Sequence, residues 1–183
     1  MNDCLFWKWT THRTYSAISF YNIISYGGKI KWDYRYTWNL HIPPTVKIFA
    51  YLCLQGKLLT HDVMEVRGFT CEMSCTLCQS CNIETAAHLF FQCEHATIVW
   101  RRVAWYLGYR LMCRGESVQD MVLKSSWKCA RQMTRRKWGV FFFSACWRIW
   151  KERNHKIFEK SCAPPIKATE GAMKEALLWL RYC

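Results

Sequence analysis

The residues of this chain best suited to chemistry are cysteines and histidines that recur at short spacing. Cys75 and Cys78 form a C-x2-C pair, and after nine intervening residues His88 and Cys93 form an H-x4-C pair. Three thiolates and one imidazole are the soft donors that bind zinc tetrahedrally. Four protein ligands leave no open position. The pattern therefore predicts one structural Zn2+ bound by Cys75, Cys78, His88 and Cys93.

Other residues near this pattern leave alternatives open. Cys71 and Cys81 flank the first pair, Cys78 and Cys81 form a second C-x2-C pair, and His95 is a spare imidazole. Either Cys71 or Cys81 could replace one of the proposed ligands. The metal-free alternative is a set of buried free thiols beside a core histidine.

The elements around the ligands must bring the two pairs to one point. The first pair suits a tight turn, and the second pair lies in an apolar run, residues 86–91, that predicts a helix. His88 and Cys93 are five residues apart, so that helix must end or bend near Gln92 for both side chains to reach one ion.

The wider pattern predicts a mainly α fold with a short N-terminal β-hairpin that begins with a strand over residues 3–9. We expect Ser16 to cap a helix over residues 17–25, and residues 29–36 to form a loop. The prolines at 43 and 44 open a helix that Gly56 stops, and Thr60 caps the next. Helices are also predicted over residues 62–66, 96–107, 118–123, 130–158 and 166–182.

Further features run in order around the ligands. They are Trp38, Pro43–Pro44, Lys47–Ile48–Phe49, Leu58, Thr60, Arg67–Gly68, Glu84, His88–Leu89–Phe90 and Trp100. Together with the cysteines, this order resembles the zinc-binding domain of plant reverse transcriptases from non-LTR retroelements, over roughly residues 3–107. The extra cysteines at 71 and 81 depart from the family pattern.

The resemblance implies a domain organisation. A zinc-binding domain would occupy residues 1–107 with its knuckle at 71–93, followed by a linker at 108–130. A basic, aromatic helical extension would occupy residues 131–183. Residues 147–158 resemble the stretch that leads from the zinc domain toward a ribonuclease-H-like domain in retroelement polyproteins.

Positive charge is concentrated in one part of the chain. The net charge is +13, and residues 101–160 hold 15 of the 26 Lys and Arg residues but only 4 of the 13 acidic residues. On an ideal helix Lys137, Arg148, Lys151 and His155 lie within about 40° of one line. This stripe favours contact with RNA or DNA, although a solvated helix face is the simpler alternative. The expected contact residues are Arg131, Arg135, Arg136, Lys137, Arg148 and Lys151.

No catalytic pattern accompanies the ligands. The chain lacks the clustered carboxylates of reverse transcriptase and ribonuclease H chemistry, and it lacks G-x-S-x-G, H-E-x-x-H and a phosphate-binding glycine loop. We therefore expect a non-catalytic zinc module that contacts nucleic acid. The alternatives are a module that docks on a reverse transcriptase or ribonuclease-H-like partner, and a degenerate retroelement fragment without selected function.

Composition bounds the location of the protein. Twelve cysteines without an apolar N-terminal signal segment predict an intracellular protein, nuclear or cytoplasmic, that is not secreted. The longest apolar run, residues 138–147, ends at Arg148 and Lys151 and is too short to cross a membrane. A 51% hydrophobic and 16% aromatic composition excludes general disorder.

Overall fold

The computed structural model describes residues 12, 14–16, 19, 32–70, 72–78, 83–108, 118–119, 121–122 and 134–182. The chain divides into two compact units, residues 1–38 and 39–183. In the first unit, the Oγ atom of Ser16 accepts from the Ser19 amide at 3.1 Å, as expected of a helix cap. The rest of the predicted helix over residues 17–25, and the predicted strand over residues 3–9, lie outside the described residues.

The loop predicted for residues 29–36 is wrong over its second half, where helix α2 (Trp32–Trp38) begins. Neither proline nor glycine interrupts this segment, and Arg35 lies in the last turn, where a cation interacts favourably with the negative end of the helix dipole.

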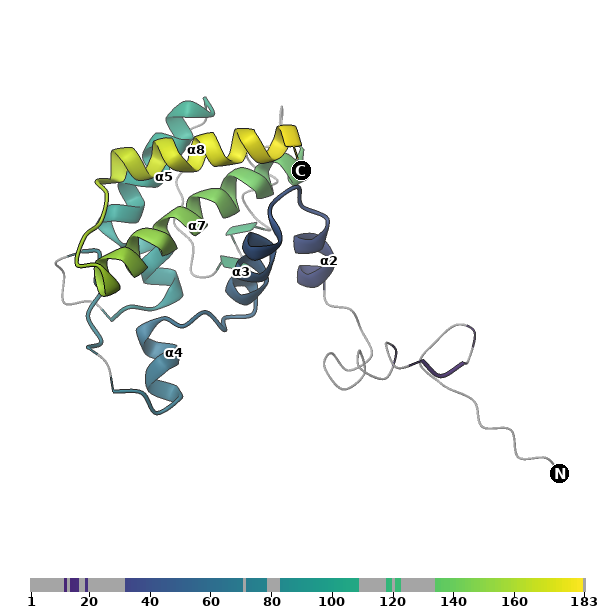
Figure 1. Ribbon diagram of the computed structural model, residues 1–183, viewed down its shortest axis with the longest axis horizontal. Helices are drawn as coiled ribbons and strands as arrows, with labels where there is room; N and C mark the ends of the chain where they lie inside the picture. Colours follow the sequence, from purple (N-terminus) through teal and green to yellow (C-terminus); the bar gives the residue numbers. More distant parts are fainter. Residues whose placement is uncertain are drawn as a thin grey trace. The chain divides into compact units, whose positions relative to one another are not determined.

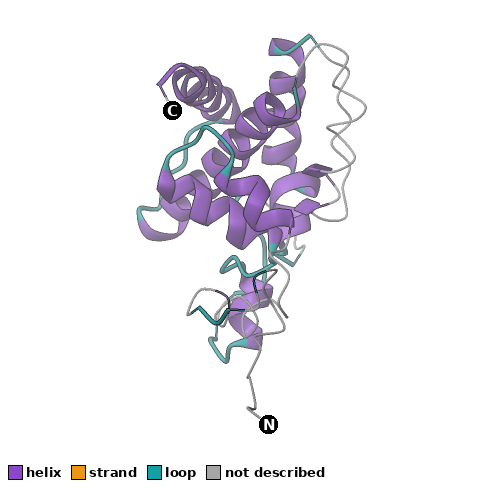
Figure 2. Cartoon of the chain, turned by 90° about the vertical axis from the view of Figure 1, so that its right-hand side faces the viewer, coloured by secondary structure: helices purple, strands orange, loops and turns teal. Residues whose placement is uncertain are grey.

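The second unit confirms the mainly helical prediction. Its helices are α3 (Pro44–Leu54), α4 (His61–Val66), η1 (His88–Gln92), α5 (Glu94–Tyr106), α7 (Arg135–Phe158) and α8 (Pro165–Tyr182). Figure 2 shows this helical content in purple, and within the described ranges the extended pairing is an isolated bridge between Ser74 and Ile83. Across the part of the chain that the structure describes, no helix has the length and apolar character needed to span a membrane.

Most helices begin close to the residues that the sequence indicates, and each difference has a local cause. Pro44 starts α3 because the first-turn amides of a helix need no internal partner. Helix α7 starts at Arg135, not at residue 130, because Thr134 is extended and its side chain accepts the Lys137 amide at 3.3 Å. Helix α5 starts two residues earlier than predicted, at Glu94, whose carboxylate suits the positive end of the helix.

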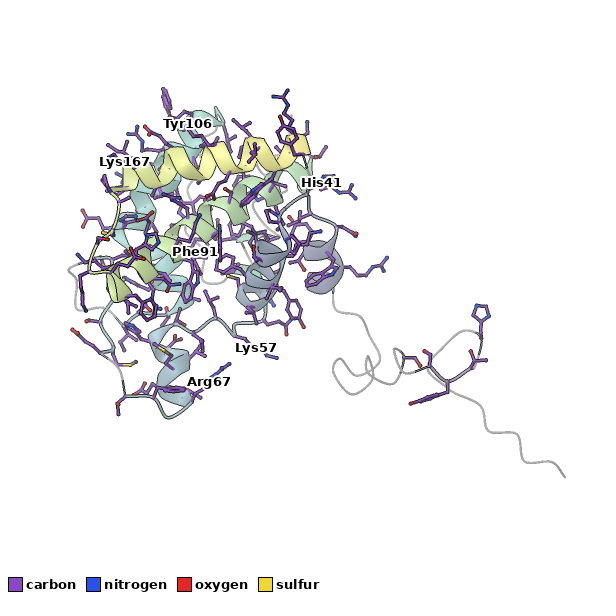
Figure 3. The ribbon with its side chains drawn as sticks, in the orientation of Figure 1. His41, Lys57, Arg67, Phe91, Tyr106 and Lys167 are labelled. Carbon is purple, nitrogen blue, oxygen red and sulfur yellow. The ribbon has the colours of Figure 1, made fainter. Side chains whose placement is uncertain are left out.

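Aromatic rings from α7 form the centre of the core. The Phe142 ring stacks on Trp100 of α5, with 5.3 Å between centroids, and on Phe91 of η1 at 6.3 Å. Trp147 meets Phe49 of α3 edge to face at 5.0 Å. Figure 3 shows Phe91 directed into the interior between the helices. Helix α7 therefore packs on the elements that surround the ligand sequence.

Helix α8 lies along α7 (Figure 1) and carries a row of small buried residues. Ala168, Ala172 and Ala176 repeat every four residues and are buried. Their short side chains allow the backbones to approach, and the Ser144 hydroxyl donates to the Ala172 carbonyl at 2.6 Å. The α7–α8 pair thus forms a closely packed layer.

Candidate metal centre

The structure brings together the four side chains that the sequence pattern predicts as zinc ligands. The ligand atoms of Cys75, Cys78, His88 and Cys93 all lie within 4.8 Å of one another. The two sulfurs of Cys75 and Cys93 are 3.9 Å apart, and the Cys78 sulfur is 3.2 Å from the His88 Nε2 atom. A tetrahedral zinc with ordinary bond lengths places two sulfur ligands about 3.8 Å apart. The cluster therefore fits one structural zinc ion.

A π turn explains how His88 and Cys93 reach one point despite their spacing. In an α-helix, residues five apart are displaced by about 140° around the axis, so their side chains diverge. Here the Cys93 amide donates to the His88 carbonyl, five residues back, at 2.7 Å. This wider turn reduces the angular displacement between the two residues. Cys93 is then extended and ends the turn, which confirms the predicted bend near Gln92.

The first ligand pair lies in a turn held at its base by the bridge between Ser74 and Ile83. Residues 76–78 form the bend, and the backbone amides of Leu77 and Cys78 direct hydrogen bonds at the Cys75 sulfur. Backbone amides aimed at a sulfur stabilise the thiolate, which is the form that binds metal. The turn at residues 75–78 therefore stabilises the thiolate form of Cys75 even without a bound ion.

Proton sharing between two ligands also favours metal binding. The hydrogen bond with Cys93 lowers the pKa of Cys75 to about 4, and it raises the pKa of Cys93, which burial raises further. One proton thus serves both sulfurs while no cation is bound. A divalent cation at this position replaces that proton and relieves the repulsion between two thiolates.

The other cysteines and histidines near the knuckle differ in surroundings. His95 is buried, and its pKa is lowered because burial disfavours the charged imidazole. It is outside the ligand cluster found among the described residues. Cys53 is buried in the core, where burial raises the pKa of its thiol. The possible substitutes Cys71 and Cys81 lie outside the described residues, so these alternatives stay open.

Glu84 lies between the two ligand pairs in the sequence, and its backbone and side chain contact the segments around them. Its amide donates to the Met73 carbonyl at 2.8 Å, and its carbonyl accepts from the Asp62 amide at 3.4 Å. Its fully buried carboxylate lies 3.6 Å from the His61 imidazole of α4 and 2.7 Å from the Arg153 guanidinium of α7. One side chain therefore connects the knuckle with two helices.

No pattern in the sequence predicts the pairing of Glu84 with Arg153. The two residues are 69 positions apart, and no spacing rule joins such distant residues. The signal available was the charge of Glu84 itself, because a carboxylate that is buried needs a cation beside it.

The residues predicted to contact nucleic acid occupy two different environments. Arg136 and Lys137 are exposed in the first turn of α7. Arg148 and Lys151 lie between α7 and α8, 26% and 27% exposed, where both approach the carboxylate of Glu175. Arg131 and the side chain of Arg135 lie outside the described residues.

One family of known proteins matches the part of the chain that holds the ligands. The family model described as zinc-binding in reverse transcriptase matches residues 15–100, which include all four ligand positions and end within α5. A comparison with curated proteins and another with solved structures give no significant match. Helices α7 and α8 lie beyond the matched residues.

Proposed function

We propose that this chain, whose residues 15–100 match the family model described as zinc-binding in reverse transcriptase, is a non-catalytic module that contacts RNA or DNA. The bound zinc fixes the fold, and exposed cations hold phosphate groups. The observation that carries the proposal is the convergence of three cysteines and one histidine from a knuckle and a π turn.

The ligand set supports a structural role for the metal. Four protein donors complete the tetrahedral coordination of zinc and leave no position for water or substrate. Cys75, His88 and Cys93 are buried, so solvent has little access to the site. The metal then supplies folding free energy directly, as it does in other small zinc domains.

The start of α7 supports contact with an anionic partner. Arg135, Arg136 and Lys137 occupy its first turn, and that turn holds no acidic residue. Cations at the positive end of a helix dipole lower the stability of the helix, whereas anions there are favourable. A phosphate group near this turn would offset the repulsion and accept hydrogen bonds from the exposed side chains of Arg136 and Lys137. We therefore assign the nucleic-acid contact to this turn first.

Ion pairs within the protein engage Arg148 and Lys151, two other candidate residues for nucleic-acid contact. The Lys151 Nζ atom lies 2.7 Å from the Glu175 carboxylate, and the Arg148 Nε atom lies 3.1 Å from that of Glu152. These carboxylates already balance the positive charge in the middle of α7. We expect Arg148 and Lys151 to contribute less binding free energy than the first-turn cations.

Salt-dependent binding of the zinc-loaded full chain tests the proposal. Fluorescent single-stranded RNA and DNA of one mixed sequence would be titrated with protein between about 50 and 200 mM salt. Phosphate contacts predict an affinity that falls steeply and log-linearly with salt. Absent binding at the lowest salt, or binding that salt leaves unchanged, would contradict the nucleic-acid contact.

A second candidate function is docking on a polymerase or nuclease partner. It is favoured by exposed apolar side chains on α5 and α8, since Trp105 is 76% exposed and Leu177 and Leu178 are more than half exposed. Apolar side chains of this size at a surface are typical of protein contact sites. Sedimentation of the zinc-loaded chain, alone and with a reverse transcriptase or ribonuclease-H-like domain, separates the two: a monomer that binds neither domain would exclude docking on these partners.

A further inference from the structure

We infer that Arg153 is a positioning residue of the zinc centre, although it lies on α7 and outside the family-matched segment. Through Glu84 it holds the two ligand pairs in register, so its loss lowers the affinity for zinc. This inference rests on the zinc-dependent part of the proposed function and is independent of nucleic-acid contact.

The argument begins with the position of Glu84 in the chain. It follows Cys75 and Cys78 and precedes the π turn that carries His88 and Cys93. Its amide donates to the Met73 carbonyl, which holds the extended residues before Cys75 against those that precede the π turn. Any movement of Glu84 therefore changes the separation between the two ligand pairs.

Thr85, the residue after Glu84, is hydrogen-bonded to the turn that carries His88. The Thr85 hydroxyl accepts from the His88 amide at 3.0 Å, and the Thr85 carbonyl accepts from the Leu89 amide at 2.8 Å. These bonds fix the first turn of the helix that carries the imidazole. Glu84 and His88 are thus connected through a short stretch of backbone that these hydrogen bonds hold in place.

The carboxylate of Glu84 has one strong partner. The Arg153 Nε and Nη2 atoms both donate to its Oε1 atom, at 3.1 and 2.7 Å. Both side chains are buried, at 0% and 4% exposure. The second carboxylate oxygen, Oε2, has no hydrogen-bond partner. A buried carboxylate in this setting depends on its guanidinium, because water cannot replace the lost interaction.

The guanidinium is itself held in place by the aromatic core. It lies 4.9 Å from the centre of the Trp150 ring, and it donates to the Asn154 side chain at 3.1 Å. Trp150 in turn lies 6.3 Å from Phe49 of α3. Arg153 therefore holds its positive charge at a fixed position beside Glu84. Through this pair, the packing of α7 influences the positions of the metal ligands.

Zinc affinity measured on the full chain tests this role. Zn2+ would be titrated into reduced protein in competition with a chromophoric chelator, with the wild type measured first. Arg153→Met is expected to lower the zinc affinity by about 10- to 100-fold, the range typical of residues that orient metal ligands. Arg153→Lys keeps the charge but loses the two-pronged contact, so an intermediate loss is expected.

Two control variants separate positioning from general effects. Lys156→Met removes an exposed cation from the same helix, and Ser144→Ala removes a buried hydrogen bond between α7 and α8 that involves neither Glu84 nor a zinc ligand. Both are expected to bind zinc nearly as the wild type does. If Ser144→Ala reduced the affinity as much as Arg153→Met, general destabilisation would explain the effect and the inference would fail.

A double variant tests the connection through Glu84. If Arg153 acts through this carboxylate, Glu84→Gln combined with Arg153→Met loses no more affinity than Arg153→Met alone. Losses that simply multiply would overturn the inference, and so would unchanged affinity in Arg153→Met. If Arg153→Met does not fold, Arg153→Lys decides in its place, and wild-type affinity there overturns the inference. Absence of zinc binding in the wild type would instead contradict the proposed function itself.

Discussion

The amide of Cys93 donates to the carbonyl of His88 across five residues, at 2.7 Å. This single bond replaces the regular α-helical pattern and lets both side chains serve one metal. It also places Cys93 at the N-cap of α5. The second ligand pair is therefore determined by backbone geometry as much as by residue type.

Replacing one ligand is expected to abolish stoichiometric zinc binding. Cys78→Ser and His88→Gln each leave three donors, and the helical signal should fall because the metal supplies folding free energy. The measurement is zinc per chain on reduced protein, with circular dichroism before and after chelation. Cys162→Ser, at an exposed position on the same chain, should retain one zinc per chain. Full zinc content in both ligand variants would contradict the assignment.

Zinc affinity is expected to rise with pH through the neutral range. The pKa of Cys93 is raised, so this thiol holds a proton at pH 7 that zinc must displace, whereas the pKa of Cys75 is lowered to about 4 and this sulfur is already a thiolate. Each proton released makes the affinity rise about tenfold per pH unit. Chelator competition at pH 6, 7 and 8 measures the slope. An affinity independent of pH would show that all ligands are deprotonated beforehand.

Truncation of the central ring should strongly destabilise the fold. Phe142→Ala removes the stacking on Trp100 and Phe91 and leaves a cavity, so a loss of about 3–5 kcal/mol in the free energy of unfolding is expected. Urea denaturation with zinc present measures it. Phe158→Ala, at the exposed end of the same helix, should change the stability by less than about 0.5 kcal/mol. Equal losses in the two variants would refute the central role of Phe142.

Neutralising the first turn of α7 should weaken binding to nucleic acid. Arg136→Gln combined with Lys137→Gln removes two exposed cations, so the logarithmic salt dependence should decrease by about 2. The matched control is Lys174→Gln with Arg181→Gln, two exposed cations on α8 that carry the same charge. Equal weakening by both pairs would indicate a response to net charge alone. Fluorescence anisotropy with RNA at several salt concentrations gives both slopes.

Local features of the site could be predicted from the sequence because their causes are local. The residue types and spacing of Cys75, Cys78, His88 and Cys93 indicate a zinc site. The five-residue interval between His88 and Cys93 requires a bend, which the π turn provides. The prolines at 43 and 44 define the start of α3 by a rule that needs only a few neighbouring residues. Thr60 occupies the predicted N-cap position of α4, but its side chain makes no capping hydrogen bond there.

Long-range pairings could not be predicted in the same way. The contact between Glu84 and Arg153 depends on how α7 packs, and the spacing of charges along one helix does not contain that information. The same limit applies to the basic stripe on α7, because Arg148 and Lys151 meet Glu175 only when α8 folds back. Helix α7 begins five residues after the predicted start at residue 130, because Thr134 is extended and caps it.

The indole nitrogen of Trp100 donates to the Phe90 carbonyl at 2.6 Å, which attaches a chromophore of α5 directly to the turn that carries two metal ligands. The same ring stacks against Phe91 and Phe142. Rearrangement of the turn on metal release would alter both the polarity and the quenching around this indole. We therefore expect the emission of Trp100 to change with zinc loading, which a comparison of the wild type with Trp100→Phe would measure without an attached dye.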